Sequence, residues 1–143
     1  NVRMGDPECQ VILPRLKTDI VKIINNCVKN KLNKINIKWT KEKSMTIVLC
    51  SKGYPGKYKK EQEIINLNKI KLNKKTYIYH AGTKFVNHKL FSVGGRVLNV
   101  TAVGSSFSNI RYQILKTLRK INWKQGFFRR DIGWRVIKKN ENN

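Results

Sequence analysis

The sequence predicts an α+β fold in which one long helix packs on a mostly antiparallel sheet. Short runs of apolar and β-branched residues in the middle of the chain indicate strands. A pair of glycines between two of these runs is typical of a tight turn between antiparallel neighbours. Nearer the end, apolar residues recur every three or four positions, which indicates a helix with one buried face. A sheet and a helix of this kind form two layers around a shared core.

The first helix is predicted from the segment Asp6-Pro7-Glu8. Asp6 is expected to cap the helix, Pro7 to occupy its first position, and Glu8 to favour its positive end. Apolar residues at helical spacing follow, but Pro14 lies among them and is expected to kink the helix or divide it in two. The apolar stripe consists of Leu13, Leu16, Ile20, Ile23 and Cys27.

A domain boundary is predicted after this helix. Residues 29–43 are polar and rich in Asn, with Trp39 as an isolated apolar anchor. We therefore expect a first unit at 1–31 and a second unit at 32–143.

The second unit contains the predicted strands. Residues 45–50 and 76–80 are runs with β-branched or aromatic members, and residues 53–56 form a turn by composition. The runs 90–93 and 96–103 flank Gly94-Gly95, which predicts a two-residue hairpin. Along the second run, alternate side chains are expected to face opposite sides of the sheet.

The long helix is expected to begin at a cap, Ser105 or Ser106. Apolar residues at spacings of three and four then mark its buried face. These residues are Phe107, Ile110, Ile114, Leu118 and Ile121.

The net charge admits two interpretations. The 143 residues include 31 Lys+Arg and 8 Asp+Glu, a formal net charge of +23. The cations are 23 Lys and 8 Arg, and Lys, Asn and Ile together supply 55 residues, a composition that an A+T-rich genome produces without selection for a partner. Alternatively the charge binds a polyanion, although the densest run, residues 69–75, has no aromatic residue on which a base could stack. A small nucleic-acid-binding module is therefore kept as the alternative function.

Other features indicate a cytoplasmic protein that does not act at a membrane. No apolar stretch approaches the ~20 residues that span a bilayer, and the start does not resemble a signal peptide. Cys9, Cys27 and Cys50 lack the spacing of a metal site, and an odd number of cysteines is typical of free thiols in a reducing compartment.

Candidate functional residues gather in the opening segment, residues 1–10. Two carboxylates and Arg3 lie there beside a glycine and a proline that shape a tight turn. One interpretation is purely structural, the capped start of a helix. The other is a site where Arg3 and a helix N-terminus bind an anion, while Asn1 offers a carbonyl oxygen to a hard cation.

The segment Arg3-Met4-Gly5-Asp6-Pro7-Glu8-Cys9-Gln10-Val11 resembles the signature of the phosphoribosylamine–glycine ligase family, also called glycinamide ribonucleotide synthetase. Met4 stands where that signature has Leu or Phe. The resemblance covers roughly the last third of such an enzyme, and the start at Asn1 rather than Met agrees with a C-terminal fragment. Further segments resemble the family in the same order: 13–21, 53–56, 80–84, 94–98 and 131–135.

The resemblance implies an ATP-grasp ligase of purine biosynthesis. In that family ATP phosphorylates the carboxylate of glycine, and the amine of 5-phosphoribosylamine attacks the glycyl phosphate to give glycinamide ribonucleotide, ADP and phosphate. Mg²⁺ or Mn²⁺ would neutralise the charge that develops on the phosphate oxygens. By the same resemblance Asn1 corresponds to a metal ligand and Arg3 to a residue that binds a substrate or phosphate anion. Asp6 and Glu8 are motif positions for which we expect a structural capping role.

The resemblance also sets the expected partners. They are the small molecules ATP, glycine and phosphoribosylamine, with no nucleic acid and no membrane, and the enzyme is expected to be a monomer. The first unit would be the end of an ATP-grasp domain, whose remaining part binds ATP and supplies the metal-binding Glu of the family. The chain by itself is therefore expected to be inactive, and no catalytic residue is assigned in it.

Overall fold

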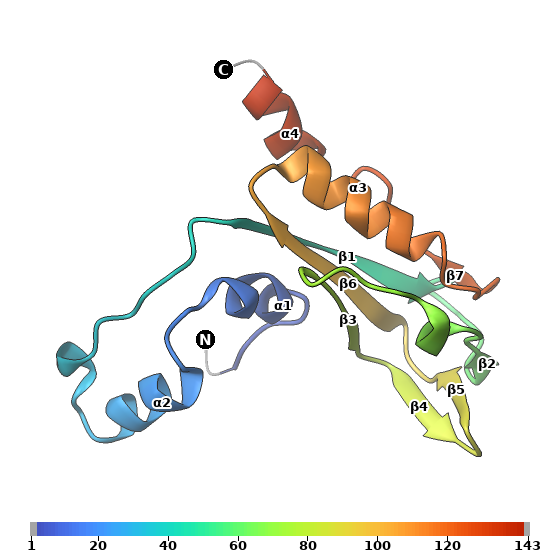
Figure 1. Cartoon of the computed structure of the whole chain (residues 1–143). Coiled ribbons are helices and arrows are strands. Elements are labelled where there is room, and N and C mark those ends of the chain that lie inside the picture. The colour runs from blue at the N-terminus through green and yellow to red at the C-terminus, as the bar shows by residue number, and fades with distance from the viewer. Residues whose placement is uncertain (1–2, 142–143) are drawn as a thin grey trace.

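The computed structural model describes residues 3–141 of the chain, with side chains up to residue 138. Figure 1 shows a twisted sheet with the long helix α3 on one side and a helical N-terminal arm on the other. The predicted α+β class, with an antiparallel sheet and one long packed helix, is confirmed.

The larger sheet has the strand order β3-β6-β1-β7, and its pairings are antiparallel. The central strands are β1 (Lys43–Ser51) and β6 (Arg96–Gly104), and the edges are β3 (Thr76–His80) and β7 (Gly126–Phe127). The strands predicted at 45–50 and 76–80 are therefore present. Their β-branched residues suit a sheet that is covered on both faces.

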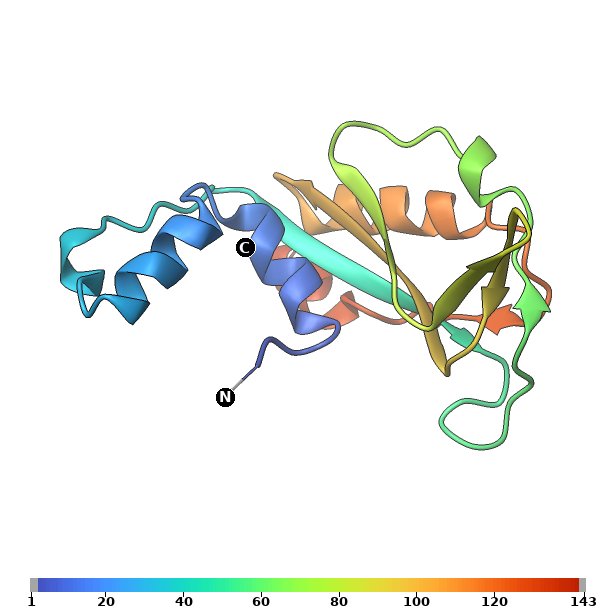
Figure 2. The same ribbon diagram turned by 90° about the horizontal axis from the view of Figure 1, so that it is seen from below.

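A smaller sheet has the order β2-β5-β4, formed by β2 (Gln62–Glu63), β5 (Lys89–Ser92) and β4 (Thr83–Val86). The predicted hairpin at Gly94-Gly95 is wrong, because within residues 3–141 β5 pairs with β2 and β4, whereas β6 pairs with β1 and β3. The two glycines instead connect one sheet to the other. Figure 2 shows the smaller sheet on the side of the molecule away from α2.

The hydrophobic core lies between the larger sheet and α3 (Phe107–Leu118). Of the two predicted caps, Ser105 and Ser106, the helix uses Ser106, whose side chain accepts a hydrogen bond from the amide of Asn109 at 3.4 Å. The predicted stripe is buried at Ile110, Ile114, Leu118 and Ile121. Opposite the helix, the sheet contributes Met45, Ile47, Leu49, Leu98, Val100 and Ala102.

The other face of the larger sheet is polar although it is buried. Thr101 donates its hydroxyl to Oγ1 of Thr46 at 2.8 Å, and Thr46 donates to the carbonyl of Val100 at 3.2 Å. Asn99 lies on the same face, two residues from Thr101, and is 0% exposed. Polar groups that are buried away from water need hydrogen-bond partners, so the side chains on this face must make specific hydrogen bonds.

The N-terminal arm reaches this polar face at one end. It consists of α1 (Glu8–Ile12), a 3-10 turn (Leu13–Arg15), α2 (Ile20–Val28) and a second 3-10 turn (Leu32–Lys34). Pro14 lies in the first 3-10 turn, so the predicted division of the helix is confirmed. Asp19 caps α2, its Oδ1 accepting from the amides of Val21 and Lys22 at 2.7 and 3.1 Å.

The arm is closed by a returning segment. The amide of Lys17 donates to the carbonyl of Lys38 at 2.9 Å, and the amide of Thr40 donates to the carbonyl of Arg15 at 2.8 Å. The predicted boundary after residue 31 stays a prediction. The remaining elements are a 3-10 turn (Leu67–Lys69) and α4 (Trp134–Glu141). In the described part of the chain no helix has the length and apolarity needed to cross a bilayer.

Candidate functional site

Asp6 is the residue through which the opening segment contacts the larger sheet. Its Oδ1 accepts a hydrogen bond from the side-chain amide of Asn99 at 3.1 Å and another from Nε2 of Gln10 at 2.9 Å. Its Oδ2 lies 3.4 Å from Nε of Arg96, and Nη1 of Arg96 donates to the Asp6 carbonyl at 3.1 Å. Asp6 thus contacts two residues that lie 90 and 93 positions further along the chain.

A β-bulge brings Arg96 and Asn99 to the same face. In the pairing of β1 with β6, Leu49 lies opposite Leu98 but Cys50 lies opposite Arg96, so Val97 is an extra residue. In a regular strand, residues three positions apart face opposite sides of the sheet. The bulge turns the Arg96 side chain to the side of Asn99, and both reach Asp6.

The capping role expected for Asp6 is wrong. Helix α1 begins at Glu8 with Pro7 as its N-cap, and in the described residues no side chain caps it. The Asp6 carboxylate instead accepts hydrogen bonds from Gln10 and Asn99 and forms an ion pair with Arg96. Glu8 lies in the first turn as expected, where its charge suits the helix end.

Three glycines of the segments that resemble the family, Gly82, Gly94 and Gly95, lie where there is little or no room for a side chain. A Cβ at Gly82 would lie 2.7 Å from Cα of Gly94, and one at Gly95 would lie 2.1 Å from a ring carbon of Tyr54. Ser51 fixes the same turn, its hydroxyl donating to the Gly94 carbonyl at 2.7 Å. Segments 53–56, 80–84 and 94–98 therefore converge at one end of β6, close to Asp6.

A cavity of about 530 Å³ opens beside this junction. Pro7 and Arg96 belong to its wall, so the cavity borders the contacts of Asp6. Aromatic rings and a second guanidinium complete a mostly apolar lining. Its other lining residues include Tyr54, Phe127, Phe128, Arg129 and Ile132.

Charge and burial shift several pKa values near the junction. Burial raises the pKa of the Cys50 thiol, an effect that the nearby Arg96 partly opposes. Burial also raises the pKa of Tyr79, with smaller contributions from Tyr77 and Cys9. Arg129 lines the cavity, and its hydrogen bonds to Asp131 hold the pKa of that carboxyl below its usual range.

The predicted site residues are only partly placed. Arg3 is exposed, three residues before Asp6, and its guanidinium is accessible to a ligand. Asn1 lies outside the described residues. The sequence does not predict that Asp6 contacts Arg96, Asn99 and Gln10. One signal for Asn99 was available, because an amide within the apolar run 97–103 needs a partner when the strand is buried.

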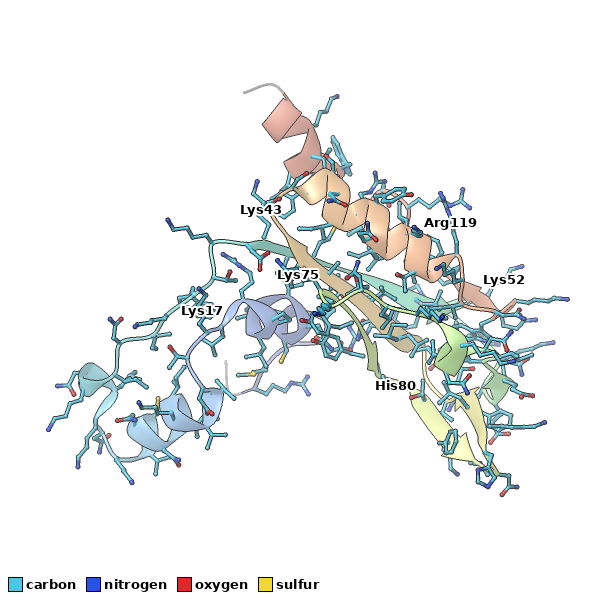
Figure 3. The ribbon with its side chains drawn as sticks, in the orientation of Figure 1. Lys17, Lys43, Lys52, Lys75, His80 and Arg119 are labelled. Atoms are coloured by element: carbon cyan, nitrogen blue, oxygen red, sulfur yellow. The ribbon has the colours of Figure 1, made fainter. Side chains whose placement is uncertain are left out.

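Figure 3 labels five of the basic residues, and they are spread over several elements. Lys17 belongs to the N-terminal arm, Lys52 follows β1, and Arg119 follows α3. The other two are Lys43 and Lys75.

Comparison with known families decides the membership of the chain. Residues 44–135 match the family described as phosphoribosylglycinamide synthetase, C domain. The chain belongs to this family. The phosphoribosylglycinamide synthetase C domain thus includes Arg96, Asn99 and most of the cavity lining, whereas Asp6 comes from the segment that precedes it.

Individual relatives of the C domain agree with the match. A phosphoribosylamine–glycine ligase of Agrobacterium fabrum is 42% identical over 96% of this chain and 32% of its own length. The chloroplastic enzyme of the same name from Arabidopsis thaliana is 39% identical over 99% of this chain and 27% of its own length. The chain therefore spans about a third of the length of its relatives.

A solved structure extends the likeness to the fold. The phosphoribosylamine–glycine ligase of Thermotoga maritima superposes with a TM-score of 0.68 and 27% identity, covering 92% of this chain and 32% of that protein. The arm and the C domain together thus have a counterpart of known structure.

Among the described side chains, no three His, Cys, Asp or Glu gather at one place.

Proposed function

We propose that this chain is part of an ATP-dependent carbon–nitrogen ligase that joins glycine to 5-phosphoribosylamine in purine biosynthesis. The observation that carries the proposal is the 42% identity over 96% of the chain to a relative named phosphoribosylamine–glycine ligase. The reaction would pass through glycyl phosphate and give glycinamide ribonucleotide, ADP and phosphate. Its substrates are small molecules, and neither nucleic acid nor a membrane takes part.

Within that reaction the opening segment supplies the residues of this chain that meet anions. Arg3 is exposed and its guanidinium is suited to bind a phosphate or carboxylate by two hydrogen bonds. Asn1 would offer its side-chain oxygen as one ligand of Mg²⁺ or Mn²⁺. That metal neutralises charge on the phosphate oxygens when it is bound. Asp6 and Glu8 support the segment rather than touch substrate.

The rest of the ligase is proposed to cover the N-terminal arm. Val21, Ile24 and Val28 are 60%, 50% and 77% exposed, a row of apolar side chains on α2 that costs free energy in water. The relatives have about two thirds of their length outside the matched part, since the match covers 32% of the Agrobacterium fabrum enzyme. We propose that a complete ligase acts as a monomer in the cytoplasm and that this chain alone is inactive.

The test replaces the matching third of the Agrobacterium fabrum enzyme with this chain, giving a hybrid ligase. We expect the hybrid to release phosphate from ATP only when glycine and phosphoribosylamine are both present, and the 143-residue chain alone to release none. Arg3→Gln in the hybrid should reduce the rate without loss of folding. A folded hybrid without glycine-dependent phosphate release would contradict the proposal, as would activity of the isolated chain.

A nucleic-acid-binding module is the second candidate, and the net charge of +23 is the observation that favours it. Binding of that kind needs cations arranged along a groove. Among the basic residues labelled in Figure 3, Lys17 in the N-terminal arm lies far from Lys52 and Arg119, so these three do not line one groove.

A further inference from the structure

We propose that Arg96 and Asn99 are positioning residues of the ligase, which hold the opening segment against the C domain through Asp6. We call the contacts of Asp6 with Arg96 and Asn99 the tether, because they join the opening segment to the C domain. The proposal rests on the proposed function, because that function gives the tether a purpose, which is to fix Arg3 where the reaction needs it.

The first support is that the tether joins segments with no local reason to meet. Asp6 accepts a hydrogen bond from Asn99, which lies 93 positions away in the sequence, and another from Arg96, which lies 90 positions away. Arg96 binds both the carboxylate and the backbone carbonyl of Asp6, which fixes the direction of the chain as well as its place. Charge-assisted contacts of this kind add geometric specificity.

The second support is the unfavourable free energy of burying the side-chain amide of Asn99. This side chain is 0% exposed in the centre of the larger sheet, and its Oδ1 is buried without a partner among the described residues. An unpartnered amide oxygen in such a place is unfavourable, and an apolar residue like its neighbours Leu98 and Val100 would serve packing better. The amide group at position 99 is therefore explained by what it donates to Asp6.

The third support is the bulge at Val97. Without the extra residue Arg96 would face α3, on the opposite side of the sheet from Asp6. Bulges commonly re-aim a side chain next to a functional site. The bulge at Val97 and the buried amide of Asn99 thus both contribute to the contact with Asp6.

The tether is close enough to control Arg3. The three residues from Asp6 to Arg3 reach at most about 11 Å when extended, so the position of Asp6 limits where Arg3 can lie. In catalysis, a displacement of ~1 Å can cost a hundredfold in rate.

The first experiment measures the tether itself in the 143-residue chain. Cys9 lies in α1 beside Asp6 and is half-buried, whereas Cys27 is exposed and serves as an internal reference. Thiol labelling followed by peptide mass spectrometry gives the rate at each cysteine. Arg96→Gln and Asp6→Asn should raise the Cys9 rate roughly threefold or more relative to Cys27, because the segment opens more often. Glu63→Gln, which breaks an exposed ion pair with Lys89 in the smaller sheet, is the matched control and should change nothing.

The second experiment measures the purpose of the tether in the hybrid ligase. Arg96→Gln and Asn99→Ala should lower kcat roughly tenfold while the KM for ATP changes little, and Arg96→Lys should recover part of the rate. A merely structural contact would move the melting temperature and leave kcat of the folded enzyme intact. Asn99→Ala is the variant most at risk of misfolding, and Arg96→Gln, at an exposed position, keeps the test decisive.

The outcomes separate the two proposals. Unchanged Cys9 labelling in Arg96→Gln shows that the tether does not hold the segment and overturns the inference. Faster labelling with unchanged kcat shows a tether without a role in the reaction and overturns it as well. An unsubstituted hybrid that folds but has no ligase activity overturns the proposed function and the positioning role with it, whatever the labelling rates.

Discussion

The side-chain amide of Asn99 donates a hydrogen bond to Oδ1 of Asp6 at 3.1 Å. The two residues belong to different parts of the fold, one to the centre of the larger sheet and the other to the start of the N-terminal arm. The aspartate of the signature-like segment therefore makes a tertiary contact rather than a helix cap, and the stability of the arm depends on the sheet beneath it.

The hydroxyl pair beneath the arm predicts an unequal effect of two conservative substitutions. Thr46→Val leaves the Thr101 hydroxyl buried without its acceptor, which should cost about 1–3 kcal/mol of unfolding free energy. Thr101→Val removes the donor and leaves Thr46 bound to the carbonyl of Val100, which should cost about 1 kcal/mol. Urea unfolding measures both. Equal losses would show that the two hydroxyls are equivalent.

The contact between Gly95 and Tyr54 predicts a steric effect that can be relieved. A Cβ at position 95 would lie 2.1 Å from the Tyr54 ring, so Gly95→Ala should destabilise the chain by about 1–3 kcal/mol. In the Tyr54→Ala background the same substitution should cost much less, because the clashing ring is gone. Thermal unfolding of the four proteins gives the coupling. Additive losses would contradict the clash.

The thiol of Cys50 predicts a dependence on pH. Burial raises its pKa in the folded chain, so the folded state holds the proton more tightly than the unfolded state does. The associated stability is present below the unfolded thiol pKa and is lost as the pH rises through the raised value. The rate of Cys50 alkylation should therefore reach its midpoint at a higher pH in the folded chain than in urea.

Arg96 gives this measurement an internal check. Its positive charge lowers the pKa of Cys50 and opposes the effect of burial. Arg96→Gln should move the alkylation midpoint to a still higher pH. A midpoint that falls instead would show that the guanidinium does not act on the thiol.

The scattered cations predict weak binding to nucleic acid. The charge of +23 attracts any polyanion, but no groove follows from the positions of the labelled basic residues. Duplex DNA and heparin should therefore bind with similar affinity, and both should be released by a moderate increase in salt. Fluorescence anisotropy measures this. A preference for one nucleic acid of defined sequence or form would favour the alternative function.

The site was only partly accessible to sequence reasoning. The segment around Asp6 was identified as functional by the density of its polar residues and by its resemblance to a family signature. The partners of Asp6 were not identified, because nothing local to residues 96 and 99 points to residue 6. The wrong assignment of Asp6 as a cap came from a rule that holds only when the carboxylate has no better donor.

The sequence by itself determined the elements whose signals are local. Pro14 indicated a kink or division of the first helix, Ser105 or Ser106 the start of the long one, and the apolar spacing of α3 the face that it buries. These features depend on interactions within a few residues, which composition and spacing report directly.

Only the tertiary structure decided which strands pair and which face Arg96 presents. Gly94-Gly95 has the composition of a hairpin turn, yet β5 and β6 enter different sheets, because β5 pairs with β4, which directly precedes it, whereas β6 pairs with β1 from much earlier in the chain. One extra residue at Val97 then reversed the side on which Arg96 lies. Pairing and register depend on contacts between distant residues, and the alternation of side chains changes with a single bulge, so neither can be read from neighbouring residues alone.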